Sequence, residues 1–87
     1  NTSPTAVINW FQKNPPLGGL GKIKLAEAYL EQDNTSKVIT LIKDGWTTAD
    51  ISKNDLGYYR AKFKKFLTSE DHLKRADYLA WEKKYWD

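Results

Sequence analysis

Apolar residues recur at helical spacing along most of the chain. Val38, Leu41 and Ile42 follow the i, i+3, i+4 pattern that places three side chains on one face of a helix. A longer stripe, at i, i+3, i+7 and i+10, is formed by Leu56, Tyr59, Phe63 and Phe66. No stretch shows the sustained alternation with a period of two that is typical of strands. The pattern therefore predicts an all-α fold without a sheet.

A helix over about residues 20–32 is predicted to be apolar on two sides. One face carries Ile23, Ala26 and Leu30. The other face carries Leu25, Ala28 and Tyr29. A helix with two apolar faces packs between two neighbours rather than lying once upon a core. We therefore expect this helix in the middle of the domain.

Capping signals mark where the helices begin. Ser3 precedes Pro4, which is the arrangement of an N-cap followed by proline at the first helical position. In the turn "DNTS", Asn34 or Thr35 is expected to cap the third helix. The last two helices are expected to open on capping boxes, in which a hydroxyl and an acid three residues later satisfy free N–H groups. The boxes pair Ser52 with Asp55 and Thr68 with Asp71.

Glycine and proline mark where the helices end. The stretch "NPPLGGLG", residues 14–21, predicts a loop after the first helix. Gly45 is expected to adopt the left-handed conformation that ends the third helix. We therefore expect about five helices in one domain, as two successive antiparallel hairpins over about residues 4–46 and 48–87. Such hairpins are typical of an α-solenoid with a tetratricopeptide-like rhythm, although the consensus of that repeat is not matched.

Composition narrows the class of protein. The 87 residues hold no cysteine, which excludes disulfides and thiolate metal sites. The net charge of +3 arises from interleaved acidic and basic residues, so we interpret it as a solubilising surface rather than a nucleic-acid patch. No apolar run approaches the roughly 20 residues of a transmembrane helix, and no signal peptide is visible. Because methionine is absent and the chain opens on Asn1, we expect a fragment of a longer protein.

Residues able to carry chemistry are few. His72 is the only histidine and has no second histidine or cysteine with which to share a metal, so a structural role is expected. Glu27 and Glu31 lie one turn apart, and we expect both on an exposed face, because a catalytic carboxylate needs burial in a cleft. The glycine-rich "GGLG" lacks the spacing of a phosphate-binding loop. No catalytic, cofactor-binding or metal-binding residue is therefore predicted.

The aromatic residues admit two interpretations. Tyrosine and tryptophan rings beside lysines can stack on sugars or nucleobases. The lysines concerned are Lys64, Lys65, Lys83 and Lys84. The rings recur at helical spacing, however, at Tyr59, Phe63 and Phe66 and again at Tyr78, Trp81 and Tyr85. This spacing favours packing between helices, and we expect the second group to form a seam for a further helix.

Several short motifs occur in a characteristic order. Over residues 10–46 they are Trp10, the double proline at 15–16, "LAEA" at 25–28, "LI" at 41–42 and Trp46. Over residues 67–87 they are Thr68, Asp71-His72, Arg75-Ala76-Asp77 and the run from Leu79 to Trp81. This order resembles the superhelical region of soluble lytic murein transglycosylases of the alphaproteobacterial type. The catalytic glutamate of that family lies in a Glu-Ser motif, and no Glu-Ser dipeptide occurs in this chain.

The resemblance implies a periplasmic parent enzyme that cleaves the β-1,4 bond between N-acetylmuramic acid and N-acetylglucosamine, leaving a 1,6-anhydro end. This chain would be a non-catalytic segment of the helical ring around the glycan strand, with peptidoglycan and the remaining domains of the same protein as partners. The alternative is a free-standing helical-repeat adaptor that binds a protein partner. No cofactor and no nucleic acid are expected in either case. An uncapped helical end would also allow self-association.

Overall fold

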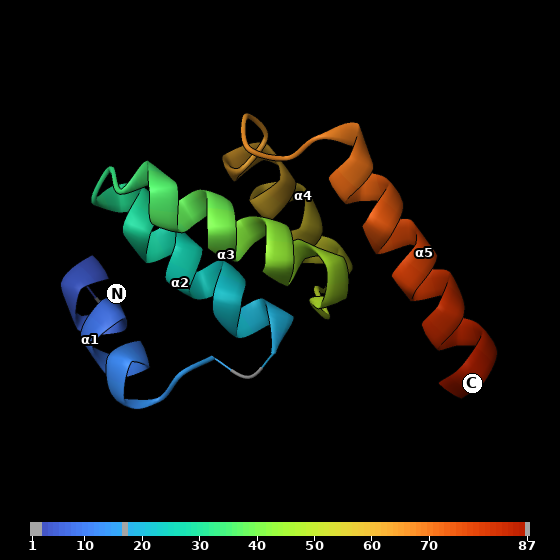
Figure 1. The fold of residues 1–87 in the computed structure, drawn as a ribbon, viewed down its shortest axis with the longest axis horizontal. Coiled ribbons are helices and arrows are strands. Elements are labelled where there is room, and N and C mark those ends of the chain that lie inside the picture. The colour runs from blue at the N-terminus through green and yellow to red at the C-terminus, as the bar shows by residue number, and fades with distance from the viewer. Residues whose placement is uncertain (1–2, 17, 87) are drawn as a thin grey trace.

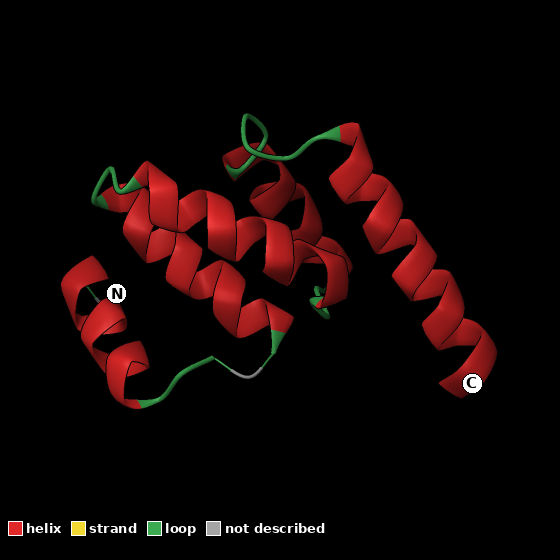
Figure 2. Cartoon of the chain, viewed as in Figure 1, coloured by secondary structure: helices red, strands yellow, loops and turns green. Residues whose placement is uncertain are grey.

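The computed structural model describes residues 3–16 and 18–86, apart from the side chain of Trp86, and this part of the chain is all-α, as predicted (Figures 1 and 2). Its helices are α1 (Pro4–Lys13), α2 (Gly19–Glu31), α3 (Thr35–Thr48), α4 (Lys53–Lys62) and α5 (Ser69–Trp86). No strand occurs among the described residues. None of the described helices has the length and apolar character needed to cross a membrane.

The helices α2 and α3 form a hairpin at the centre of the molecule (Figure 1). In the turn between them, Asp33 adopts a left-handed conformation with a φ of 58°. The N–H of Asp33 donates to the Leu30 carbonyl at 3.0 Å, and the N–H of Asn34 donates to the Tyr29 carbonyl at 2.9 Å. These bonds satisfy carbonyl groups in the last turn of α2, which is how a left-handed residue ends a helix. Asn34 is the N-cap residue of α3, although its side chain makes no capping hydrogen bond.

The prediction that α2 is apolar on two sides is confirmed. Ile23 and Ala26 have no exposed surface and lie in the main core, whereas Leu25 and Ala28 are buried against α1. The main core draws on α2, α3, α4 and the loop after α3, and comprises Ile23, Ala26, Val38, Ile42, Trp46, Ala49, Tyr59 and Phe63. The helix α2 is therefore held between α1 on one side and α3 and α4 on the other.

The last two helices join the core in different ways. From α4 and its C-cap, Tyr59 and Phe63 enter the main core. The predicted aromatic stripe extends beyond this helix, since α4 ends at Lys62 and Phe66 lies in the following turn, half-buried against the core. The helix α5 packs against α3, and its second half extends away from the other helices (Figure 1).

The prediction that Gly45 ends the third helix is wrong. The helix α3 continues to Thr48, and Gly45 does not have a left-handed conformation. Gly45 lies where α3 passes close to the beginning of α2, because a Cβ atom added to it would be 2.8 Å from the carbonyl oxygen of Gly19. Glycine is required here because two helix backbones touch, and not because the chain turns.

The hydroxyl caps predicted for three helices are confirmed. Ser3 Oγ accepts a hydrogen bond from the first turn of α1 at 3.2 Å, and Ser52 Oγ accepts one from the Asp55 N–H at 3.3 Å. At α5 the capping box is reciprocal. The Thr68 N–H donates to Asp71 Oδ2 at 2.8 Å, and the Asp71 N–H donates to Thr68 Oγ1 at 3.3 Å. Local sequence signals alone therefore set where these helices begin.

Candidate functional site

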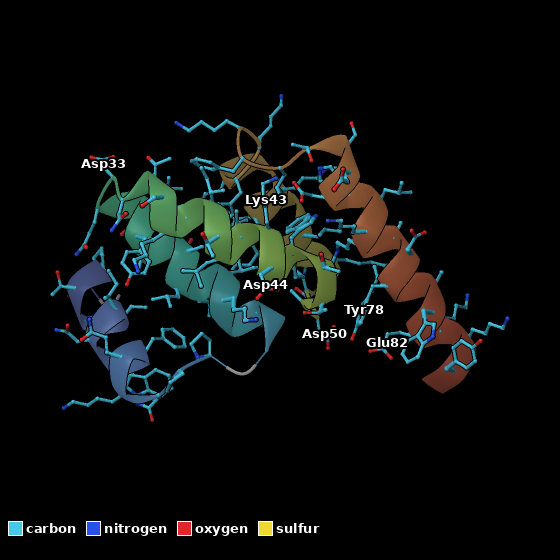
Figure 3. All side chains as sticks on the ribbon, viewed as in Figure 1. Asp33, Lys43, Asp44, Asp50, Tyr78 and Glu82 are labelled. Atoms are coloured by element: carbon cyan, nitrogen blue, oxygen red, sulfur yellow. The ribbon has the colours of Figure 1, made fainter. Side chains whose placement is uncertain are left out.

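A cluster of buried polar side chains lies where α5 meets α3. Asp71 and Arg75, one turn apart on α5, are only 5% and 8% exposed. Charged side chains are rarely buried this deeply unless they are paired. Asp71 Oδ2 accepts hydrogen bonds from Lys43 of α3 at 2.7 Å and from Thr68 Oγ1 at 3.0 Å (Lys43 is labelled in Figure 3). The carboxylate therefore caps its own helix and at the same time joins it to α3.

The contacts of Asp71 change its pKa. Burial by itself would raise the pKa, but the hydrogen bonds from Lys43 and Thr68 outweigh it and hold the pKa below the ordinary value of 3.8. A carboxyl group whose pKa is lower in the folded chain stabilises the fold above its unfolded pKa. That contribution is lost as the pH falls through the folded pKa.

We expect the substitution Asp71→Asn to destabilise the chain by about 1–2 kcal/mol at neutral pH, because it weakens a helix cap and a charge-assisted hydrogen bond. The difference from the native chain should shrink as the pH falls below 3.8, since the native carboxyl group then loses its charge. Urea unfolding measured at several pH values tests both parts. Glu70→Gln, at an exposed acid in the first turn of the same helix, is the control. A difference that is independent of pH would contradict the assigned role of the charge.

Arg75 binds carbonyl groups at the C-terminal end of α3. Its Nη1 donates to the carbonyl oxygens of Trp46 and Ala49, each at 2.8 Å. The guanidinium carbon also lies 5.1 Å from the centre of the Trp46 ring, within the range of a cation–π contact. Burial lowers the pKa of Arg75, and the nearby charge of Asp50 opposes that effect. A cation at the C-terminal end of a helix is favourable because the free carbonyl groups there are partly negative.

His72 is part of the same junction. Its Nδ1 accepts a hydrogen bond from the Trp46 indole N–H at 3.3 Å, and the two rings meet edge to face at 5.8 Å between centroids. Accepting through Nδ1 requires the proton of the neutral ring to lie on Nε2. The observed contacts of His72 are thus with the core tryptophan. Among the described residues, no three side chains of the His, Cys, Asp or Glu type lie close enough together to hold a metal ion.

A second polar cluster joins α2 to α4. Glu27 Oε2 accepts hydrogen bonds from the Tyr58 hydroxyl and from the Lys62 ammonium, each at 2.8 Å. Burial would raise the pKa of Glu27, but these two hydrogen bonds outweigh it and lower the pKa. The expectation that Glu27 lies on a plain exposed face is therefore wrong, whereas Glu31 is exposed and reaches Lys62 only at 3.9 Å. A carboxylate held ionised in this way ties two helices together and is a poor proton donor near neutral pH.

The junction between α3 and α5 is hollowed on two sides. One cavity, of about 660 Å³, is lined mainly by polar side chains: Thr40, Lys43, Asp44, Thr47, Thr48, Thr68, Glu70, Asp71 and Lys74. The other, of about 480 Å³, lies between the end of α3 and the second half of α5 and includes Asp50, Tyr78 and Glu82, labelled in Figure 3. The Tyr78 hydroxyl donates to Glu82 at 2.5 Å, and this hydrogen bond raises the pKa of Tyr78. Both hollows are lined by acidic and basic side chains. Neither therefore has the character of an anion-binding or a cation-binding site.

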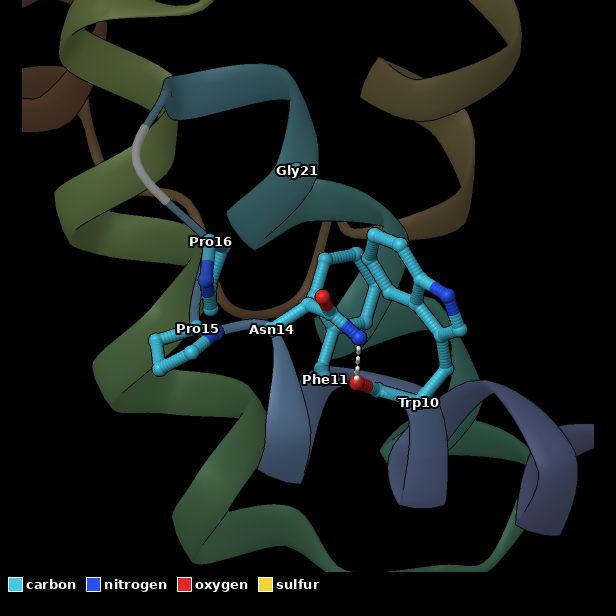
Figure 4. Close-up of a pocket in the computed structure, with 6 residues that line it drawn as sticks. All are labelled: Trp10, Phe11, Asn14, Pro15, Pro16 and Gly21. Carbon is cyan, nitrogen blue, oxygen red and sulfur yellow. Dashed lines mark hydrogen bonds between the residues drawn. The ribbon is translucent and has the colours of Figure 1, made fainter.

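A third hollow, lined mainly by apolar side chains, lies between α1 and α2 and has a volume of about 520 Å³ (Figure 4). It is lined by Trp10, Phe11, Asn14, Pro15, Pro16 and Gly21. The Trp10 ring is 58% exposed and meets the Phe11 ring edge to face at 5.0 Å. The Asn14 amide donates to the Trp10 carbonyl oxygen at 2.9 Å, as the dashed line shows. A surface tryptophan beside prolines is suited to a flat, partly apolar ligand.

Comparison with known proteins identifies no relative. No known protein family, no curated protein and no solved structure matches the chain. In the helix junctions of the described residues, every buried side-chain nitrogen and oxygen has a hydrogen-bond partner.

Proposed function

We propose that this chain is a non-catalytic helical segment of a periplasmic peptidoglycan lytic transglycosylase. It supports or encircles the glycan strand for a catalytic domain elsewhere in the same protein. Within it, the α2–α3 hairpin is one unit of a tetratricopeptide-like superhelix. The proposal starts from the resemblance in the order of sequence motifs and is supported by the use that the fold makes of those motifs.

One observation carries the proposal: several of the residues on which the resemblance depends make contacts between helices. Ala26 of "LAEA" and Ile42 of "LI" have no exposed surface, and Trp46 is 1% exposed. The later motif supplies Asp71 and Arg75, which bind α3 through Lys43 and through the carbonyl groups at its end. Residues that set the geometry of a scaffold would be used in this way, whereas catalytic residues would be grouped around a cleft.

Exposed aromatic residues offer the contact surface that a scaffold around a sugar polymer needs. Trp10 beside the α1–α2 hollow and Trp81 on α5 are 58% and 49% exposed. Indole rings stack on the apolar faces of sugars and keep a polar N–H available. The net charge of +3 is mild and mixed in sign, which does not favour nucleic acid.

The test is co-sedimentation of the chain with purified sacculi, followed by analysis of the soluble products. We expect the chain to pellet with sacculi and to release no 1,6-anhydro-muropeptides. Cellulose serves as the control for unspecific retention by an insoluble glycan. Release of anhydro-muropeptides would overturn the non-catalytic assignment.

The second candidate function is a helical-repeat adaptor that binds a protein partner. It is favoured by the exposure of Trp81 and Tyr85 on a helix that extends from the fold (Figure 1). The same experiment separates the two functions. An adaptor would show no affinity for sacculi and would recover one partner protein in stoichiometric amount.

A further inference from the structure

One face of α5 carries a continuous row of long side chains, which we name the α5 stripe: Lys74, Tyr78, Trp81 and Tyr85. Their spacing of four, three and four residues is the spacing of a seam between two paired helices. The rings of Trp81 and Tyr85 contact each other at 5.1 Å between centroids, yet remain 49% and 60% exposed. Two large rings already packed together form a preorganised apolar surface, which favours binding because little side-chain freedom remains to be lost.

Two residues of opposite charge flank the stripe on one side. Asp77 precedes Trp81 by four residues and Lys84 follows it by three, so both lie on the same side of the helix as the indole. Both side chains are exposed. Among the described residues, the ion pairs of this chain involve neither of them. The stripe thus presents an acid about one turn before its central tryptophan and a base about one turn after it.

We propose that the α5 stripe binds the α5 stripe of a second copy of this chain, with the two helices antiparallel about a two-fold axis near Trp81. In this arrangement Asp77 faces Lys84 of the second copy, and the symmetry forms the same ion pair twice. The Tyr85 ring then reaches toward Tyr78 of the second copy. An interface of this kind is isologous, since one surface patch serves both partners.

The pattern of charge selects this occupant and this direction. In a parallel pair, a residue that flanks the seam meets the residue five positions later in its partner, so Asp77 would approach Glu82 of the second copy. Like charges in contact are unfavourable. A polyanion such as nucleic acid would meet the acid as well as the base. In an antiparallel pair, by contrast, Asp77 and Lys84 each face a residue of opposite charge in the second copy. The interface does not require the proposed glycan role, but it covers Trp81, which leaves Trp10, among the described side chains, as the exposed indole available to a glycan.

The interface is small and the dimer is correspondingly weak. The 18 residues of α5 span about 27 Å at 1.5 Å per residue. Contacts of this size belong to the low end of specific interfaces, where dissociation constants are on the order of micromolar. Sedimentation equilibrium of the complete chain from about 1 μM to about 1 mM covers this range.

A charge exchange tests the arrangement. Asp77→Lys and Lys84→Asp each turn two attractive pairs into two repulsive ones, so each variant alone should dimerise about tenfold more weakly than the native chain. An equimolar mixture of the two variants restores both attractive pairs and should form a heterodimer about as tight as the native dimer. Circular dichroism first confirms that both variants keep their helix content.

Lys83→Asp is the matched control. It makes the same change of charge as Lys84→Asp, but residue 83 lies on the side of α5 away from the stripe, so the dimer should be unchanged. A native chain that stays monomeric throughout the concentration range would overturn the proposal. That outcome would leave a further helix of the same protein as the occupant of the stripe. A mixture that is no tighter than either variant alone, or equal weakening by Lys83→Asp, would equally contradict the antiparallel pairing.

Discussion

The substitution Gly19→Ala is expected to destabilise the chain by about 3 kcal/mol or more, a large part of the roughly 4–13 kcal/mol typical of a domain of this size. A Cβ atom at Gly19 would be 2.5 Å from the backbone nitrogen of Ala49 and 2.6 Å from the carbonyl oxygen of Gly45. These are backbone atoms of α3 and its cap, and they cannot turn aside as a side chain would. To accept the methyl group, α2 and α3 must move apart along the contact that holds Ile23 and Trp46 in the main core.

Urea unfolding, followed by tryptophan fluorescence, measures this loss. Gly57→Ala is the matched control, since a Cβ atom at Gly57 in the middle of α4 would have no other atom within 4 Å. That variant should gain about 0.5–1 kcal/mol, because alanine favours a helix and restricts the unfolded chain. Both substitutions add one methyl group to a helical glycine, so only their surroundings differ. Similar stabilities of the two variants would contradict the close approach of α2 and α3.

Sequence alone predicts the elements of this fold well, because they depend on neighbours in the chain. The hydroxyl caps at Ser52 and Thr68 join residues three positions apart, so their chemistry is complete within the motif. The two-sided α2 is likewise predicted from the spacing of apolar residues along one helix. In each case the physical cause lies within a few turns of the residue that shows it.

Contacts between distant residues could not be predicted in the same way. Gly45 signals a helix end in sequence, and only the approach of Gly19, 26 residues earlier, gives it another role. Glu27 looks like a surface acid until Tyr58 and Lys62 are brought to it by the packing of α4. The prediction that Glu27 is exposed was wrong because no residue near it in the chain indicates that Tyr58 and Lys62 will contact it.

The residues that could carry chemistry divide in the same way, into features visible in the sequence and roles that depend on distant contacts. The scarcity of histidine and the absence of cysteine can be seen from composition, and they limit metal chemistry in any fold that the chain could adopt. The role of Arg75 cannot be seen in this way, because its acceptors are backbone carbonyls that any residue could supply. A charged residue one turn after a capping acid gives no signal of burial. Its importance follows only from the position of α3.

Arg75 is for that reason the residue whose replacement should separate α5 from the rest of the fold. Arg75→Met keeps much of the side-chain volume but removes two hydrogen bonds to buried carbonyl groups and the contact with the Trp46 ring. We expect a loss of about 2–4 kcal/mol, because hydrogen bonds from a charged donor are strong and the carbonyl groups would be left without a partner. Arg75→Lys keeps the charge and one nitrogen donor but loses the planar guanidinium beside the Trp46 ring, so its loss should be intermediate.

Amide hydrogen exchange distinguishes detachment of α5 from general unfolding. In the Arg75→Met chain, amides of α5 should exchange faster than those of α2, because the α2–α3 contact contains no atom of Arg75. Lys83→Met, an exposed substitution on the same helix that removes the same charge, should change the stability by less than about 0.5 kcal/mol. If exchange accelerated equally in α2 and α5, Arg75 would be a support of the whole core. If it accelerated in α5 alone, the buried cation would be the attachment of one helix to the end of another, and the α3–α5 junction would be the point at which this fold opens first.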